Sequence, residues 1–286
     1  MNAMSKNIPT YPLNILKQDA ADQLDFLFVH QKIETPQVPI DLPYRSSYYG
    51  VGICVQGEAL LHANLESYKI QSGCVVTMSP HVIKQWHYMS ADFTTLTIFF
   101  TDLFLAGNEQ FPFFERVANH VFAVSAAEAK GIIASLKFIQ QKYEKAAGFR
   151  NEILQSLAKV LLYEMTVLYN QQSFVVNTPG RSQLLSADFK KLVQQYFYTE
   201  RSVRFYAEKL FVSRKHLSET VKEITGKTAG EWIDATVVLE AKVLLLNPTY
   251  SIAQIADMLY FSDQSRFGRY FKNLTGLSPL EYRQTS

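Results

Sequence analysis

The sequence predicts an α+β protein with two domains: an N-terminal β-barrel followed by two helices, and a C-terminal all-α domain. Three observations support this prediction. Short strand-like segments, separated by glycine, proline and serine turns, follow one another over residues 49–100. Two long helical patterns follow within residues 125–170. The remaining C-terminal part contains one helix-turn-helix pattern twice.

The domain boundary is predicted in a segment without helical periodicity. In residues 171–183, uncharged polar residues precede the pair Pro179-Gly180, a combination typical of a linker. We therefore expect an N-terminal domain over residues 1–170 and a C-terminal domain over residues 184–286. The first fifteen or so residues carry no packing pattern, and we expect disorder or an arm there.

Composition and charge limit the class of protein. The chain has 286 residues, 48% of them hydrophobic, which is enough for two cores. The net charge of +2 demands no particular partner: residues 184–286 contribute +3 (14 Lys/Arg against 11 Asp/Glu) and residues 1–183 contribute −1 (14 against 15). No apolar run could span a bilayer and no signal-peptide pattern is present, so we expect a cytoplasmic protein without a membrane partner. Cys54 and Cys74 lie in apolar stretches and are expected to be reduced core thiols.

The first elements are expected to be short strands. Alternating and β-branched segments bounded by turn residues lie at residues 49–55, 57–64, 68–70, 73–78, 84–88 and 93–100. A series of this kind predicts a small barrel or jelly roll.

Two helices are expected after the strands. A capping box of Ser125 and Glu128 begins the first helix, which runs to about residue 145. The second covers about residues 149–169 and has one apolar stripe, formed by Ile153, Leu157, Leu161, Met165 and Leu168. Such a stripe fits either a core contact or a partner interface.

The C-terminal repeat predicts two helix-turn-helix units, at residues 203–225 and 252–275. Ala207 and Leu210 correspond to Ala256 and Leu259 at an offset of 49 residues. After the turn the offset is 50, and it relates Lys222, Thr225, Gly226 and Glu231 to Lys272, Thr275, Gly276 and Glu281. The extra residue falls in the turn, where insertions are best tolerated.

Each second helix of a unit is predicted to have a buried and an exposed face. Apolar side chains at spacings of four and three form the buried face, namely Leu217, Val221 and Ile224, then Phe267, Phe271 and Leu274. The opposite face carries side chains that can hydrogen-bond phosphate oxygens and base edges in a major groove: Arg214, Lys215, Ser218, Glu219, Lys222, Gln264, Ser265, Arg266, Arg269 and Lys272.

Local signals predict where the C-terminal helices begin and end. Capping-box pairs stand at Thr228 with Glu231, Ser251 with Gln254, and Ser278 with Glu281. Gly226 and Gly276 follow the second helices as left-handed C-cap residues. Pro279 takes a first helical position.

One long helix is predicted between the two units. Residues 229–246 have helical apolar spacing and no proline, and Asn247-Pro248 ends the pattern. Such a helix spans roughly 27 Å. We therefore hypothesise that it holds the two exposed faces about one turn of B-DNA apart.

Residues 184–286 resemble the DNA-binding domain of AraC/XylS-type transcriptional regulators. The resemblance is most specific between Ile252 and Arg283, with Ile-x-x-Ile-Ala, Ser-x-Phe, Arg-x-Phe-Lys, Thr-Gly, Ser-Pro and Tyr-Arg in order. It implies sequence-specific binding of double-stranded DNA, with base contacts from Arg214, Lys215, Ser218, Glu219, Gln264, Ser265, Arg266 and Arg269. Lys222 and Lys272 are better placed for phosphate contact. It also implies a cupin-like barrel, pairing into homodimers through the helices after it, and RNA polymerase as a partner of an activator.

Two positions depart from that resemblance. Tyr260 stands where glycine is usual in the second turn, and a bulky residue at positive φ costs about 1–2 kcal/mol. Glu219 stands where a basic or amide side chain is commoner. It could accept from a cytosine amino group or be a solvated charge, and we favour the solvated charge.

The predicted barrel is the expected site of a small-molecule effector. Tyr49, His62, Tyr68, Trp86 and His87 suit a mostly aromatic pocket with a few donors. Gly57, His62, Glu66, Gly73 and His87 follow a degenerate cupin pattern in which Asn64 replaces the second histidine. His62, Glu66 and His87 could hold a divalent metal, but pocket lining is the commoner role, so we predict no metal and no cofactor.

We therefore interpret the chain as a transcriptional regulator without catalytic residues, controlled by an effector through the linker. Two alternatives remain open. One is a cupin-type metalloenzyme with an attached DNA-binding domain, and the other is a constitutive DNA-binding protein whose barrel only dimerises. The sequence does not indicate the effector, the operator, or activation as opposed to repression.

Overall fold

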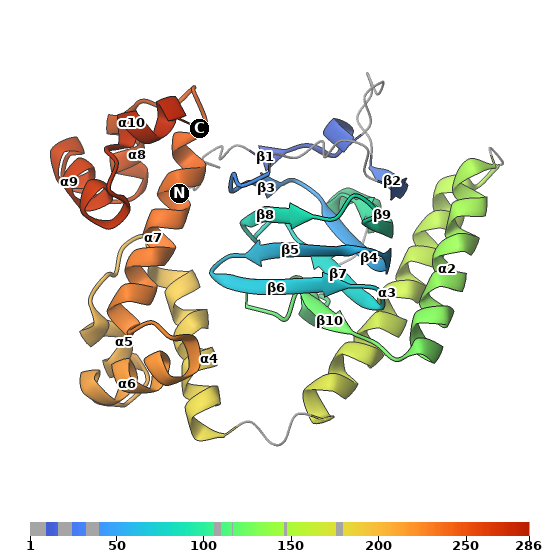
Figure 1. Cartoon of the computed structure of the whole chain (residues 1–286), viewed down its shortest axis with the longest axis horizontal. Coiled ribbons are helices and arrows are strands. Elements are labelled where there is room, and N and C mark those ends of the chain that lie inside the picture. Colours follow the sequence, from blue (N-terminus) through green and yellow to red (C-terminus); the bar gives the residue numbers. More distant parts are fainter. Residues whose placement is uncertain are drawn as a thin grey trace. The chain divides into compact units, whose positions relative to one another are not determined.

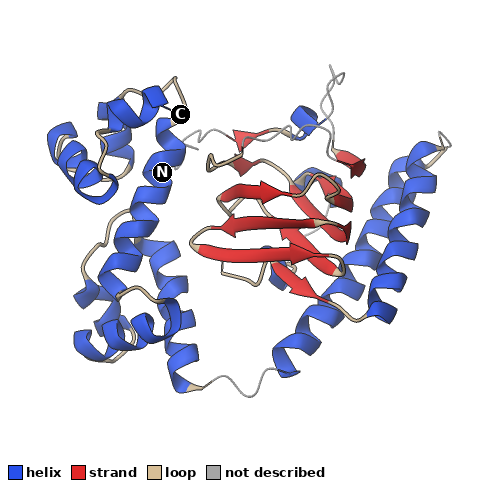
Figure 2. Cartoon of the chain, viewed as in Figure 1, coloured by secondary structure: helices blue, strands red, loops and turns tan. Residues whose placement is uncertain are grey.

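The computed structural model describes residues 10–16, 25–32, 40–105, 110–115, 117–145, 148–175 and 180–285. The chain divides between Val176 and Asn177 into two compact units. The N-terminal unit contains sheets and helices, whereas every described element of the C-terminal unit is a helix (Figures 1 and 2).

The N-terminal unit is built around two antiparallel sheets. The five-stranded sheet has the order β10 (Val121–Ala123), β7 (Cys74–Met78), β4 (Tyr49–Gln56), β9 (Thr94–Phe100) and β2 (Phe26–Lys32). The three-stranded sheet has the order β6 (Glu66–Gln71), β5 (Glu58–Ala63) and β8 (Lys84–Met89). A two-residue parallel pair is formed by β1 (Thr10–Tyr11) and β3 (Arg45–Ser46). The six predicted strands are therefore confirmed as β4 to β9.

The chain passes from one sheet to the other at Gly57. This residue has a φ of 76°, and a Cβ placed there would lie 2.6 Å from Cα of Phe93. Only glycine fits such a close backbone approach at positive φ. Strand β5 then alternates, with Ala59, Leu61 and Ala63 buried and the intervening side chains more exposed.

The space between the two sheets is filled by side chains. Cys54 and Val76 of the larger sheet pack with Leu61, Ile70 and Trp86 of the smaller one. The expected barrel interior is therefore a packed core. Cys54 is buried and Cys74 partly buried, both are free thiols, and burial raises the pKa of Cys54 to about 11.

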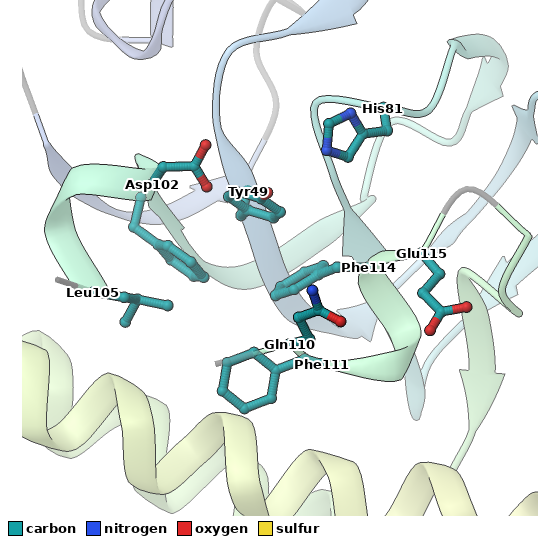
Figure 3. Close-up of a pocket in the computed structure, with 9 residues that line it drawn as sticks. Tyr49, His81, Asp102, Leu105, Gln110, Phe111, Phe114 and Glu115 are labelled. Carbon is teal, nitrogen blue, oxygen red and sulfur yellow. The ribbon is translucent and has the colours of Figure 1, made fainter. Parts of the chain in front are cut away.

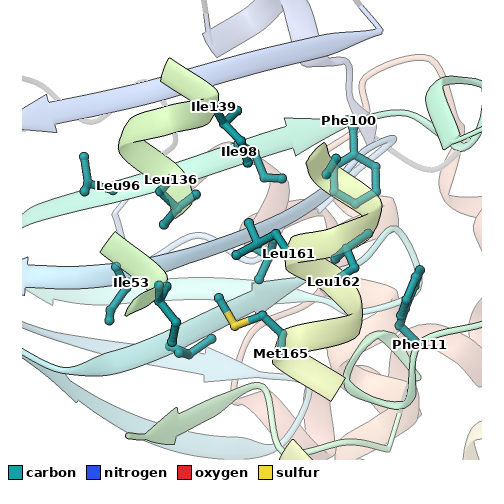
Figure 4. Packing of buried hydrophobic residues seen from close by; sticks show 14 of the residues in the cluster. Ile53, Leu96, Ile98, Phe100, Phe111, Leu136, Ile139, Leu161, Leu162 and Met165 are labelled. Carbon is teal, nitrogen blue, oxygen red and sulfur yellow. The ribbon is translucent and has the colours of Figure 1, made fainter. Parts of the chain in front are cut away.

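Two long helices cover the other face of the five-stranded sheet. Helix α2 (Ala126–Glu144) begins with the predicted capping box of Ser125 and Glu128, and α3 (Arg150–Val175) follows it. Figure 4 shows Leu136 and Ile139 of α2, and Leu161 and Met165 of α3, facing the side chains of the sheet. Two short elements, α1 (Asp102–Leu105) and η2 (Pro112–Phe114), follow β9.

The apolar stripe predicted on the second helix is divided between core and surface. Leu161 and Met165 are buried and Leu157 and Leu168 pack against the core, but Ile153 is 37% exposed. The core-facing line is completed by the helix residues Leu154, Ala158 and Leu162.

The N-terminal segment is more ordered than predicted from residue 10 onward. Strand β1 pairs with β3, and the short helix η1 (Leu13–Leu16) places Leu13 in a small core with Tyr48 and Phe99. Residues 1–9 lie outside the described part of the chain. The contacts of this segment are long-range and leave no local period in the sequence, so its order could not be predicted from residue spacing.

The C-terminal unit contains seven helices in its described residues: α4 (Arg181–Tyr196), α5 (Val203–Lys209), α6 (Arg214–Thr225), α7 (Ala229–Leu245), α8 (Ile252–Met258), α9 (Gln264–Thr275) and α10 (Pro279–Thr285). All three predicted capping pairs form, and Gly226 and Gly276 adopt the left-handed conformation. The segment predicted as a linker is helical at both ends, because α3 extends to Val175 and α4 begins at Arg181.

The predicted burial of Ile224 and Leu274 was wrong. Ile224 is 40% exposed and Leu274 is 46% exposed, whereas Leu217, Val221, Phe267 and Phe271 are buried. Both exposed residues lie in the last turn before the glycine cap, at the end of the buried face.

Candidate DNA-binding surface and effector pocket

Helix α6 presents the polar side chains predicted for the first unit. Ser213 caps it by accepting the backbone N–H of His216 at 3.1 Å. Arg214, Lys215, Glu219 and Lys222 are exposed and Ser218 is half-buried. Glu219 approaches Lys215 within 3.9 Å, an exposed pairing within the helix.

Helix α9 presents a matching surface. Asp263 caps it by accepting the backbone N–H of Arg266 at 2.7 Å. That hydrogen bond and one from Ser262 hold the pKa of the Asp263 carboxyl below its usual value, so it stays ionised. Gln264, Ser265, Arg266, Arg269 and Lys272 are all exposed.

Both turns contain an aromatic residue in the left-handed conformation. Tyr260, singled out from the sequence, has a φ of 56°, and its counterpart Phe211 has the same value. The ring of Phe211 is 95% exposed and that of Tyr260 is 62% exposed. The backbone of the second turn is therefore kept in spite of Tyr260, at the cost of local strain.

Side chains from several elements fix the second unit to the rest of the domain. The guanidinium of Arg201, just before α5, donates to the carbonyl of Leu259 and lies 3.8 Å from the ring centroid of Phe261. The hydroxyl of Tyr270 on α9 donates to Asp234 on α7 at 2.6 Å. Arg283 of α10 donates to the carbonyls of Leu245 and Tyr250. The orientation of α9 on α7 is thus held by hydrogen bonds as well as by the core.

The five residues predicted to line an effector pocket lie in different surroundings. Trp86 belongs to the core between the sheets and donates to the hydroxyl of Tyr44 at 3.0 Å. Tyr68 donates to the carbonyl of Ala118 at 3.3 Å. His62 and His87 contact each other, whereas Tyr49 at the start of β4 packs on Phe100 and Phe114.

His62 and His87 form a hydrogen-bonded chain with Asp41. Nε2 of His87 lies 3.0 Å from Nδ1 of His62, and Nδ1 of His87 lies 2.6 Å from the Asp41 carboxylate. Burial and the neighbouring His87 lower the pKa of His62. Among the described residues, no group of three or more histidine, cysteine, aspartate or glutamate side chains could hold a metal ion.

A pocket of about 380 Å³ lies beside Tyr49, on the helix-covered side of the five-stranded sheet. Figure 3 shows its lining: Tyr49, Phe100, Phe111 and Phe114 with Leu105, Gln110, His81, Asp102 and Glu115. Burial, and next the charge of Asp102, raise the pKa of Tyr49 to about 12, so its hydroxyl stays protonated.

Of the predicted pocket residues, only Tyr49 lines this pocket. Phe100 comes from β9 and His81 from the turn between β7 and β8. The remaining lining residues lie in α1, in η2 or directly beside η2, and were not assigned from the sequence. The aromatic run Phe111-Pro112-Phe113-Phe114 was the available signal. Three phenylalanines in four residues indicate burial against neighbours.

None of the described helices is both long and apolar enough to cross a membrane.

The chain is similar to known proteins over its C-terminal part and, more distantly, over most of its length. Residues 206–285 match the family model described as a helix-turn-helix domain. An uncharacterised HTH-type transcriptional regulator, YisR of Bacillus subtilis, is 23% identical over 60% of this chain and 58% of its own length. The arabinose operon regulatory protein of Salmonella typhimurium is 22% identical over 85% of this chain and 86% of its own.

The match to YisR thus spans little more than half of that relative. Among solved structures, ToxT of Vibrio cholerae with a bound unsaturated fatty acid is 15% identical, covering 91% of this chain and 95% of its own, with a TM-score of 0.39. Residues 206–285 therefore belong to the helix-turn-helix domain family that this model describes, and the named relatives to which the chain is similar are HTH-type and operon regulators.

Proposed function

We propose that this protein is a cytoplasmic transcriptional regulator that binds specific DNA sites through α6 and α9 and responds to a small molecule bound in its N-terminal unit. The observation behind the DNA part is that both helices expose polar and basic faces while their opposite faces are buried on the same domain. Helix α7, with 17 residues and a length of about 26 Å, separates the two helix-turn-helix units (Figure 1).

Selection of binding sites from a random duplex pool tests this proposal. The full-length chain at near-physiological salt is expected to enrich sites with two contacted segments about ten base pairs apart. The exposed aromatics of the two turns do not prevent this, because both turns keep the same backbone. Binding without enrichment, which disappears as salt rises, would contradict specific recognition.

Arg269 and Lys272 form a matched pair for assigning roles within α9. Replacing Arg269 by alanine is expected to reduce discrimination at one base position by about 1–3 kcal/mol of binding free energy. The reason is that a planar guanidinium can form two hydrogen bonds with the edge of a guanine. Replacing Lys272 is expected to weaken binding to all sequences alike and to reduce its salt dependence. If both variants weaken binding to all DNA sequences equally, Arg269 contacts the phosphate backbone and not a base.

The effector part of the proposal is supported by the position of the pocket beside Tyr49. Phe111 lines this pocket, and its ring contacts Tyr163 of α3 at a centroid distance of 5.6 Å. Helix α3 is the last described element before the C-terminal unit. A ligand that moves Phe111 therefore acts on the helix that precedes the DNA-binding domain.

We also propose that the protein acts as a homodimer, with RNA polymerase as a further partner if it activates. The homodimer is supported by a line of exposed apolar residues on α3, spaced seven residues apart: Ile153, Val160 and Val167.

A further inference from the structure

The walls of the pocket beside Tyr49 are aromatic. The ring centroid of Phe114 lies 4.9 Å from that of Tyr49, 6.0 Å from that of Phe100 and 6.2 Å from that of Phe111. Phe100, Phe111 and Phe114 are buried, whereas Tyr49 is partly exposed. A ligand in the pocket would therefore meet ring surfaces along these walls.

The charged groups of the pocket are carboxylates. Asp102 and Glu115 are exposed at the lining, and in Figure 3 they stand on opposite sides of the aromatic rings. No lysine or arginine is among the described lining residues. Tyr49 and Asp102 both line the pocket, and a side-chain hydrogen bond joins them.

We propose that this pocket binds a small organic cation, an amine, guanidine or quaternary ammonium compound with an apolar body. Aromatic faces attract a cation through their negative quadrupole, and a carboxylate within reach adds a charge-assisted hydrogen bond or ion pair. The volume of about 380 Å³ is that of a pocket for a small ligand. The inference rests on the proposed function only in treating this pocket as the effector site.

Other charge classes fit the lining less well. An anionic ligand would place its charge beside two carboxylates, with no lysine or arginine among the described lining residues to offset them. A neutral ligand would gain from the rings but leave both carboxylates without a partner from the ligand. Among ligands that share the same apolar part, the arrangement of rings and carboxylates therefore favours the one with a positive charge.

A series of three probes with one body and different charge tests this selection. 4-Phenylbutylamine, 4-phenylbutanol and 4-phenylbutyrate are titrated into the full-length protein by calorimetry. The amine is expected to bind at least about tenfold more tightly than the alcohol, and the acid more weakly still. Equal or tighter binding of the acid, or no binding by any probe, would overturn the proposal.

Carboxylate variants locate the bound amine. Asp102→Asn and Glu115→Gln are each expected to weaken binding of the amine several-fold and to leave binding of the alcohol unchanged. Glu58→Gln is the control, because Glu58 is a half-exposed carboxylate on β5 that pairs with Lys69 outside this pocket. Unchanged amine affinity in both pocket variants overturns the assignment of the site.

DNA binding, measured on the same samples, separates this inference from the proposed function. Amine binding that also changes affinity for a selected DNA site supports both. Amine binding without any change in DNA affinity supports the ligand class and contradicts effector control. Specific DNA binding by a protein that binds no probe of the series overturns the ligand class and leaves the DNA-binding proposal standing.

Discussion

Phe211 and Tyr260 occupy the same strained position in the two helix-turn-helix units. A side chain with a Cβ is disfavoured at a φ near 56°, and glycine is not. Since Phe211 is almost fully exposed, its ring adds little burial to compensate. The strain is therefore a local cost that the rest of the domain offsets.

We expect Phe211→Gly to raise the free energy of unfolding by about 1 kcal/mol relative to Phe211→Ala, because alanine keeps the Cβ that causes the strain. Urea unfolding of the two variants measures the difference. An alanine variant as stable as the glycine variant would show that the position carries no such strain.

Lys84 is a buried cation in the N-terminal unit. Its Nζ donates to Oγ of Ser46 at 2.8 Å and to the carbonyl of Ser79 at 2.9 Å. Burial, and next the charge of Arg45, lower its pKa from 10.5 to about 7. Because the folded pKa is the lower one, the unfolded chain binds more protons between these values. The titration of Lys84 therefore makes the free energy of unfolding increase as pH rises from about 7 to 10.5.

Lys84→Met is expected to remove this dependence. Above pH 7, the free energy of unfolding of the wild type should increase relative to that of the variant by up to about 1.4 kcal/mol per pH unit. Urea unfolding at several pH values between 7 and 10 measures it. A difference independent of pH would mean that Lys84 keeps its proton in the folded state throughout.

At the scale of elements, the C-terminal domain depends on contacts that join its two helix-turn-helix units. Arg201 precedes α5 of the first unit but contacts Leu259, Phe261 and Tyr270 of the second. Guanidinium stacking on a ring and a bond to a helix-end carbonyl both depend on its planar shape.

We expect Arg201→Met to lower the free energy of unfolding of the C-terminal domain by about 1–3 kcal/mol, since the variant keeps the apolar stem but loses the guanidinium contacts. It should also broaden the range of spacings accepted between the two contacted DNA segments. Repeating the site selection with this variant measures the second effect, and Arg204→Met, at an exposed position of α5, is the control. Equal behaviour of the two variants would show that Arg201 does not set the orientation of the units.

At the scale of the whole molecule, α3 connects the two roles proposed for the N-terminal unit. One side of it packs on the sheet, and the side that carries Val160 and Val167 is exposed. A second copy of the chain would cover these residues in the proposed homodimer.

Val160→Lys is expected to weaken that homodimer by about 2–4 kcal/mol, because two copies of the charge would be placed in one apolar contact. Sedimentation equilibrium measures the association, and Gln155→Lys adds the same charge at another position of α3 as the control. If both variants associate like wild type, the pairing does not use this face.

Most of the secondary structure could be predicted from the sequence, because its signals are local. Capping pairs such as Thr228 with Glu231, and the cap glycines, act within four residues of the helix end they define. The repeat made the same signals visible twice. The exposed faces of α6 and α9 follow from helical periodicity, and all the predicted DNA-contact side chains there are exposed or half-buried.

The pocket was decided by tertiary structure. Tyr49 meets Phe100 because β4 and β9 pair in a register that aligns these two residues, and η2 then brings Phe114 against both. Register and loop placement depend on long-range packing, which residue spacing does not encode. Residue spacing was enough to predict the helix-turn-helix units, whereas the packing of sheets and helices brings the aromatic and acidic side chains of the pocket together.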